Sequence, residues 1–184
     1  MIRSMCIVIL CLFASGYAEP STGDGHVWVA GNLSIPFPSN AVHAGWIQGG
    51  TQIYVGRITH TIHGTLTAQV VAEKGTAFAA YYLSNNTWAC GHHLTYEILV
   101  DEGDFEYAWI RSYDGFYEKG SVSVGTLNHK DQVFICRAYL NGELLLGNKY
   151  GYDEFCYVFS LAGIERDARF YKYEILMARP KCHG

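Results

Sequence analysis

The chain has 184 residues, with 13 Lys or Arg and 17 Asp or Glu, and a formal net charge of −4 at neutral pH. This acidic balance argues against nucleic acid or an anionic membrane as the main partner. The length fits one domain or two small ones, and it permits a sizeable core without help from disulfides.

The first eighteen residues, 1–18, have the pattern of a secretory signal peptide. Arg3 supplies a positive charge, residues 5–14 form a short apolar run, and Gly16 and Ala18 place small residues at −3 and −1. That run is far shorter than the roughly 20 residues of a membrane span. We therefore expect a secreted, extracellular protein without a membrane span, in which a polar leader, residues 19–27, precedes the fold.

Short runs rich in Tyr, Val, Ile and Phe, separated by Gly, Asn and Pro, follow from Trp28 onward. This pattern predicts an all-β fold with little helix. The Asn141-Gly142 pair predicts a type I′ hairpin turn. The predicted strands are 52–59, 65–71, 77–83, 95–100, 132–140, 143–149, 154–160 and 170–177.

One of these runs occurs twice. Residues 53–58 read IYVGRI, and residues 133–138, 80 positions later, read VFICRA. Four further elements repeat in the same order at similar offsets, which indicates a duplication. We predict two tandem β repeats of about 75–80 residues, related by pseudo-two-fold symmetry and sharing one compact domain. The predicted division is a first repeat 28–100, an acidic connector 101–107, a second repeat 108–179 and a tail 180–184.

An arginine ends the repeated run in both copies. Arg57 and Arg137 lie in apolar surroundings, and the last strand of each copy carries a carboxylate, Glu97 or Glu174. We interpret all four as structural residues that form ion pairs, which fix register more than they add stability. The alternative is a pair of ligand-binding arginines.

Four cysteines remain after removal of the signal peptide, and an even number in a secreted chain permits two bridges in three connectivities. If the strands after Cys136 form a flat meander, Cys136 and Cys156 are two strand spacings apart, about 9–10 Å, which is too far to bridge. A two-fold axis would bring Cys90 and Cys182 together, so we predict a Cys90–Cys182 disulfide. Asn32 and Asn85 begin glycosylation sequons and are predicted to lie on exposed loops.

The repeated elements resemble the DM-nine repeat family. A tryptophan is followed by Pro-x-x-Ala-Val-x-x-Gly, then Tyr-Val-Gly-Arg, then Gly-x-Leu, and finally Tyr-Glu-Ile-Leu. Here these elements are Trp28, 38–45, 54–57, 64–66 and 96–99, with a partial echo over 109–176. The resemblance implies an all-β fold with two tandem repeats. Characterised members include mannose-binding lectins of invertebrate innate immunity that act as dimers, so the resemblance also implies a homodimer.

The resemblance also implies where a sugar would bind. In mannose-binding members an acidic residue after the Ala-x-x-Gly element and a lysine from a Pro-Gly-Lys element contact sugar hydroxyls. The first copy has Ile47 or Gln48 at the acidic position and Ala-Gln-Val at the lysine position, so it lacks both charges. In the second copy the acidic position falls at Leu127 or Asn128. The ligand residues implied across both copies are Gln48, Asn128, Asp131, Asn148, Lys149 and Glu165.

Two functions remain open. The first is a secreted carbohydrate-binding protein that recognises glycans or glycoproteins, mannose-type by analogy, in immunity or host-surface interaction. The second is a protein-interaction or structural protein that has lost sugar binding on the same scaffold. No nucleophile elbow, phosphate loop or metalloprotease motif is present, so we expect no enzyme activity, no metal and no cofactor.

Overall fold

The computed structural model describes residues 25–83, 87–116, 119–127, 131–160 and 168–182. Within these ranges the strands form one 14-stranded sheet whose pairings are antiparallel. The only helical segments described are two short 3-10 turns, Gln48–Gly50 and Ala72–Lys74. The all-β prediction is therefore confirmed.

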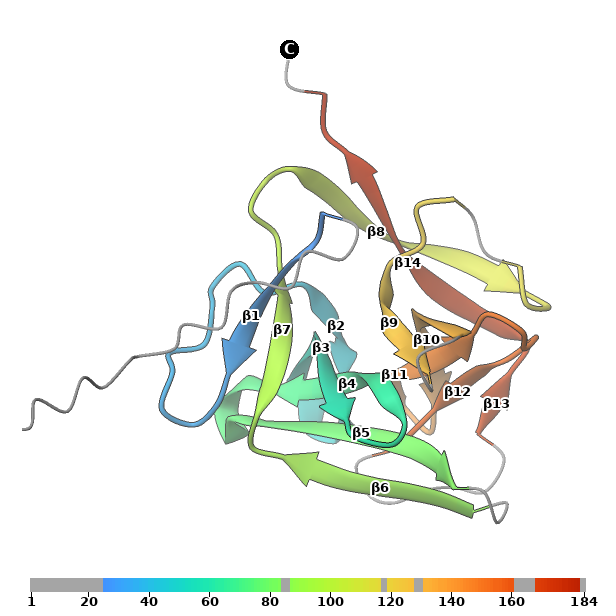
Figure 1. Ribbon diagram of the computed structural model, residues 1–184, viewed down its shortest axis with the longest axis horizontal. Helices are drawn as coiled ribbons and strands as arrows, with labels where there is room; N and C mark the ends of the chain where they lie inside the picture. Colours follow the sequence, from blue (N-terminus) through green and yellow to red (C-terminus); the bar gives the residue numbers. More distant parts are fainter. Residues whose placement is uncertain (1–24, 84–86, 117–118, 128–130, 161–167, 183–184) are drawn as a thin grey trace, which may run out of the picture.

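The first half of the chain contributes seven strands, which Figure 1 colours from blue to light green. They are β1 (Val27–Gly31), β2 (His43–Trp46), β3 (Gln52–His60), β4 (Gly64–Val71), β5 (Thr76–Leu83), β6 (Thr87–His93) and β7 (Tyr96–Val100). The second half contributes the strands coloured from yellow-green to red in the same view. They are β8 (Phe105–Tyr113), β9 (Ser123–Leu127), β10 (Asp131–Leu140), β11 (Glu143–Tyr150), β12 (Cys156–Val158), β13 (Arg169–Phe170) and β14 (Lys172–Pro180).

The two halves pair their strands in the same order. β1, β7, β3 and β4 are successive neighbours in the first half, as β8, β14, β10 and β11 are in the second. The registers also correspond, because Arg57 lies opposite Glu97 and Arg137 lies opposite Glu174. Two tandem repeats related by a pseudo-two-fold axis, as predicted, account for this correspondence.

Each repeat also lends a strand to the other. β2 pairs with β3 of its own half and with β11 of the other half, whereas β9 pairs with β10 and with β4. One hydrophobic core draws on both halves, from Trp28 and Ile53 to Leu145 and Ile175. The repeats therefore share a core, and neither repeat completes its sheet alone.

The two repeated arginines hold these exchanged strands. Arg57 donates from Nε to the Glu97 carboxylate at 2.7 Å and from Nη1 to the carbonyl of Val124, in β9, at 3.2 Å. Arg137 donates to the Glu174 carboxylate at 2.6 Å and to the carbonyl of Ala44, in β2, at 2.6 Å. The same contacts thus occur in both directions across the pseudo-two-fold axis.

The hairpin between β10 and β11 has the predicted turn. Asn141 and Gly142 have φ values of 51° and 88°, and Leu140 lies opposite Glu143. Both positive φ values belong to a type I′ turn, for which Asn-Gly is the favoured sequence.

Six strands were not predicted as separate runs: β1, β2, β6, β8, β9 and β13. Their sequences contain Gly, Ala, Ser, His or charged residues in place of a continuous β-branched run. β8 begins at Phe105, inside the range predicted as connector, and β14 reaches Pro180, inside the predicted tail. The predicted signal peptide lies outside the described residues. No helix in the described ranges combines the length and apolar character needed to cross a bilayer.

Candidate functional site

The floor of a surface groove is formed by three neighbouring strands, β8, β14 and β10. Side chains alternate between the two faces of a strand, and pairing aligns them across strands. Glu174 of β14 lies opposite Arg111 of β8 on one side and opposite Arg137 of β10 on the other. Two residues further along the same face, Lys172 lies opposite Tyr113.

The wall of this groove comes from the other repeat. Trp46, at the end of β2, lies opposite Leu144 of β11. β2 is held in this place by its backbone, because Trp109 Nε1 donates to the carbonyl of His43 at 3.1 Å and Arg137 donates to that of Ala44. The groove is therefore a product of the junction between the repeats.

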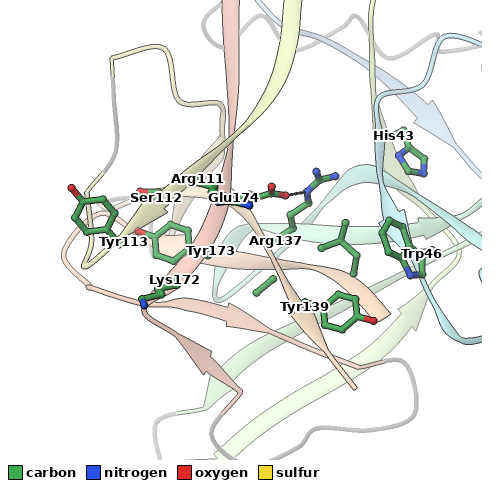
Figure 2. A pocket seen from close by; sticks show the side chains of 12 residues that line it. His43, Trp46, Arg111, Ser112, Tyr113, Arg137, Tyr139, Lys172, Tyr173 and Glu174 are labelled. Carbon is green, nitrogen blue, oxygen red and sulfur yellow. Dashed lines mark hydrogen bonds and ion pairs between the residues drawn. The ribbon is translucent and has the colours of Figure 1, made fainter. Parts of the chain in front are cut away.

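Figure 2 shows how the lining side chains are arranged. The Arg137–Glu174 ion pair lies at the centre, with Trp46 and His43 on one side and Tyr113 and Lys172 on the other. The groove has a volume of about 820 Å³, within the usual range for small-molecule sites. Its lining residues are His43, Trp46, Arg111, Ser112, Tyr113, Arg137, Ala138, Tyr139, Leu144, Lys172, Tyr173 and Glu174.

Aromatic side chains in the groove are open to solvent. Trp46 is 37% exposed, and Tyr113 and Tyr139 are each 62% exposed. Large apolar rings are normally buried when they serve only the core. Three exposed rings that share one concave surface are typical of a binding site.

The ion pair on the floor is fixed from several sides. The guanidinium of Arg137 lies 4.2 Å from the ring centroid of Trp109, and its Nε donates to one oxygen of the Glu174 carboxylate. Burial lowers the pKa of Arg137, and the hydrogen bond and charge of Glu174 oppose that shift. Because an arginine side chain remains protonated at ordinary pH, the groove keeps a charged, planar donor and a carboxylate acceptor in fixed positions.

The first repeat has the same ion pair without the groove lining. By register, Ala30 corresponds to Arg111, Thr59 to Tyr139 and Thr95 to Lys172. Thr126 takes the place of Trp46, since these two residues pair with Gln132 and Gln52. The aromatic and cationic side chains thus surround the Arg137–Glu174 pair and have no counterparts around the Arg57–Glu97 pair, although the scaffold beneath them occurs twice.

Comparison with known proteins identifies the repeat. The sequence profile of the DM9 repeat matches residues 47–167, well over half of the chain. The chain belongs to the DM9 repeat family. A search of curated proteins found no match.

The crystal structure of the nematode sperm cell motility protein MFP2B has a similar fold. The TM-score is 0.57 at 14% sequence identity, over 86% of this chain and 48% of that one. The present DM9 chain thus spans about half of the length of MFP2B. At this identity the likeness bears on the fold alone.

None of the described ligand residues implied by the DM9 resemblance lines the groove. Gln48 lies in the first 3-10 turn, where its backbone N–H donates to the Glu143 carboxylate at 2.7 Å. Asp131 is exposed at the start of β10. Asn128 and Glu165 lie outside the described residues. The structure therefore does not bring the described members of this set into the groove.

Asn148 is fully buried and joins the two repeats. Its Oδ1 accepts from the backbone N–H of Thr67 at 2.9 Å, and its Nδ2 donates to the carbonyl of Ala80 at 3.3 Å. Gln69 makes the matching link in the other direction, because its Nε2 donates to the carbonyl of Phe159. Asn148 is thus a buried link between repeats, without access to a ligand in solvent.

Replacing Asn148 with alanine is expected to lower the free energy of unfolding by about 2 kcal/mol, because Thr67 N–H and Ala80 C=O lose their partner in the interior. Urea unfolding of the variant, followed by tryptophan fluorescence, measures this. Asn40 is exposed and its side-chain Nδ2 donates to the carbonyl of Asp101, so Asn40→Ala is the matched control. Equal stability of the two variants would contradict a linking role for Asn148.

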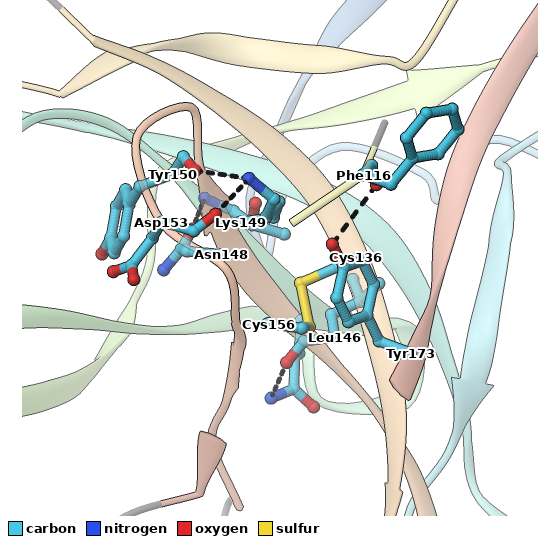
Figure 3. The surroundings of a disulfide bond; sticks show 11 residues. Phe116, Cys136, Leu146, Asn148, Lys149, Tyr150, Asp153, Cys156 and Tyr173 are labelled. Atoms are coloured by element: carbon cyan, nitrogen blue, oxygen red, sulfur yellow. Dashed lines mark hydrogen bonds between the residues drawn. A yellow bond between two sulfur atoms is a disulfide. The ribbon is translucent and has the colours of Figure 1, made fainter. Parts of the chain in front are cut away.

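Lys149 is also fully buried. Its Nζ donates to the carbonyls of Tyr150 and Asp153, each at 2.7 Å (Figure 3). Burial lowers the pKa of Lys149, and the nearby Asp153 carboxylate raises it in part. The ammonium group closes the β11–β12 loop onto itself, and it does not face the groove.

The predicted Cys90–Cys182 disulfide is wrong. Cys136 and Cys156 form the bridge (Figure 3), and Cys90 and Cys182 are free and exposed. The prediction assumed a flat sheet, but the Cα atoms of Cys136 and Cys156 are only 6.0 Å apart. β12 does pair with β11, with Gly147 opposite Val158 in place of Cys156.

Gly147 explains the short distance between these cysteines. A Cβ atom built on Gly147 would lie 2.1 Å from the carbonyl oxygen of Tyr157, so the backbone of β12 occupies the space of the missing side chain. β12 can therefore lean across β11 towards β10, and Cys156 reaches Cys136 from the face of the sheet.

The remaining predictions concern glycosylation and metal binding. Asn32 accepts hydrogen bonds from the backbone N–H groups of Ser34 and Ile35, at 2.7 and 3.1 Å, in a turn after β1. Its glycosylation remains a prediction, and Asn85 lies outside the described residues. The described part of the chain holds no group of three or more His, Cys, Asp or Glu residues suited to a metal ion.

Proposed function

We propose that this DM9 repeat protein is an extracellular carbohydrate-binding protein and that its ligand occupies the groove between β2 and the β8–β14–β10 floor. The observation that carries the proposal is the combination of exposed rings and a fixed ion pair in one concavity. A pyranose ring offers an apolar C–H face on one side and hydroxyl groups around its edge. Trp46 and Tyr139 suit the first, and Arg137 with Glu174 suits the second.

The same groove favours binding over catalysis. Glycoside hydrolysis ordinarily requires two carboxyl groups on opposite sides of the scissile bond. Among the described lining residues Glu174 is the one carboxylate, and Arg137 already engages it. The signal-peptide pattern and the Cys136–Cys156 bridge are consistent with an oxidising, extracellular site of action, in recognition at a cell or microbial surface.

A protein-interaction role is the second candidate. It is favoured by the placement of Asn148 and Lys149, because these two of the residues that the family resemblance assigns to the sugar are buried here. The two functions differ in whether free sugar competes. A lectin loses its glycan or glycoprotein partner when sugar is added, whereas a protein-binding surface keeps it.

Replacing Trp46 with alanine is expected to weaken glycan binding at least about tenfold, because a tryptophan at the centre of an interface commonly contributes more than any neighbour. A glycan array, which includes mannose-type oligosaccharides, selects the ligand, and titration calorimetry measures the affinity. Since the described residues form this lining once, at the junction between the repeats, we expect one ligand per chain.

Tyr152 provides the matched control for this experiment. It is an exposed ring outside the groove lining, so Tyr152→Ala should bind as the unchanged protein does. If Trp46→Ala bound the glycan as tightly as the unchanged protein does, the groove would not be the binding site. Absence of any glycan that binds the unchanged protein would favour the protein-interaction role.

A further inference from the structure

Two cations of the groove lining belong to no ion pair among the described residues. They are Arg111 on β8 and Lys172 on β14, and both are exposed. The arginines that serve the fold, Arg57 and Arg137, are both paired with a glutamate. Glu174 lies between Arg111 and Arg137 in register but is bonded to Arg137.

The pairing of β8 with β14 brings these cations to one end of the groove. Arg111 lies opposite Glu174, and Lys172 lies opposite Tyr113, so Arg111 and Lys172 are diagonal neighbours on one face. Diagonal positions are roughly 7–8 Å apart between Cα atoms, a distance that long side chains span easily. In Figure 2 this end lies across the Arg137–Glu174 pair from Trp46.

The fold does not require either cation. The first repeat closes the same three strands with Ala30 and Thr95 at the corresponding positions. The chain as a whole is acidic, with a formal net charge of −4, so a general excess of basic residues does not explain the cluster. Two unpaired cations at one end of an aromatic groove therefore point to a negative group on the ligand.

We infer that the groove selects an oligosaccharide with an acidic substituent, either a uronate carboxylate or a sulfate ester. The inference rests on the proposed carbohydrate-binding function and narrows its ligand class. Arg111 and Lys172 bind the anionic group, with the guanidinium donating two parallel hydrogen bonds. The adjoining ring of the oligosaccharide lies against Trp46 and Tyr139, and its hydroxyl groups bond the Arg137–Glu174 pair.

Calorimetric titration with three matched probes tests this inference. The probes are hyaluronan oligosaccharides, the same oligosaccharides with their carboxyl groups reduced to alcohols, and chondroitin sulfate oligosaccharides whose carboxyl groups are likewise reduced, so that sulfate is their one anionic group. We expect the carboxylated or the sulfated probe to bind at least about tenfold more tightly than the reduced one, as hydrogen bonds to charged groups are the stronger kind. Which of the two acidic probes binds better identifies the anionic group.

Variants assign the selectivity to the two cations. Arg111→Gln and Lys172→Gln should each weaken binding of the acidic probe about tenfold and leave binding of the reduced probe unchanged. Lys74→Gln removes the same charge in the 3-10 turn after β4, outside the groove lining, and should change neither affinity. Because Arg111 and Lys172 are exposed, thermal unfolding should show all three variants to be as stable as the unchanged protein.

Three results would contradict the inference, and they differ in whether the proposed carbohydrate-binding function also fails. Equal affinity for the acidic and reduced probes, with no effect of Arg111→Gln, would overturn the inference and leave the proposed function standing. No binding of any oligosaccharide would overturn both. Displacement of the acidic probe by polyglutamate as readily as by the free oligosaccharide would overturn the inference in favour of an acidic peptide ligand.

Discussion

Replacing Arg57 with alanine is expected to lower the free energy of unfolding by about 3 kcal/mol, because removal of one partner of a buried ion pair leaves the other partner's charge uncompensated. The side chain of Arg57 is only 10% exposed. It bonds both oxygens of Glu97, donates to the Val124 carbonyl of β9 and lies 4.4 Å from the ring centroid of Trp28. We place the effect at the lower end of the usual range because the Glu97 side chain is 32% exposed and keeps some water.

Two further variants separate the ion pair from simple loss of an arginine. Arg111→Ala removes an exposed arginine with no ion pair and should change stability by less than about 0.5 kcal/mol. Arg57→Met combined with Glu97→Leu removes both charges at similar volume and should recover most of the lost stability. Urea unfolding measures all three variants. If Arg57→Ala were as stable as Arg111→Ala, the pair would not hold β9 against the first repeat.

Arg57 is the better residue for this test than its counterpart Arg137. Arg137 has the same contacts in the second repeat, but it also lines the groove. A change in ligand binding after replacement of Arg137 would therefore combine two effects: loss of its own contact with the ligand and displacement of β2. The duplication thus supplies a stability test in one repeat that leaves the candidate site of the other repeat unchanged.

The duplication was visible in the sequence because the elements that repeat are those that face the core. Runs such as 53–58 and 133–138 lie in strands whose residues are mostly buried, so their types are restricted. The Arg57–Glu97 and Arg137–Glu174 pairs belong to the same restricted set. For these residues a pattern of residue types was enough to predict the strand and its neighbour.

The groove was not visible in the same way, because its parts are far apart in the sequence. Its wall is β2 of the first repeat, and its floor is β8, β10 and β14 of the second repeat. β8 was not predicted as a strand, so the sequence did not indicate that Trp109, Arg111 and Tyr113 alternate onto one face. A sequence signal did exist, because Arg111, Tyr139 and Lys172 of the second copy correspond to the smaller residues Ala30, Thr59 and Thr95 of the first.

Asn148 and Lys149 were misjudged for a different reason. Polar residues near the end of a strand are usually solvated, but β11 is buried on both faces over its last six residues. β10 and β12 pair with its two edges, and Asn148 bonds backbone groups of Thr67 and Ala80. Thr67 and Ala80 belong to the first repeat, so Asn148 finds its polar partners only where the two repeats pack together across the pseudo-two-fold axis.

Loss of the Cys136–Cys156 bridge is expected to lower the free energy of unfolding by about 3 kcal/mol. The bridge spans 20 residues, and closing a loop of that size restricts the unfolded chain by about this amount. The double variant Cys136→Ala with Cys156→Ala tests it by urea unfolding, with Cys90→Ala and Cys182→Ala as the matched control. Reduction of the unchanged protein should reproduce the first double variant, whereas the control should remain as stable as the parent.

Peptide mapping without reduction tests the connectivity that underlies this expectation. The peptide containing Cys136 should be linked to the peptide containing Cys156, and a thiol reagent should label Cys90 and Cys182 in the folded protein. A link between Cys90 and Cys182 would contradict the bridge. Because β12 reaches β10 only across Gly147, a Gly147→Ala variant should also impair formation of the link, since its Cβ would meet the Tyr157 carbonyl oxygen. The bridge therefore depends on a glycine that lies in neither cysteine's strand.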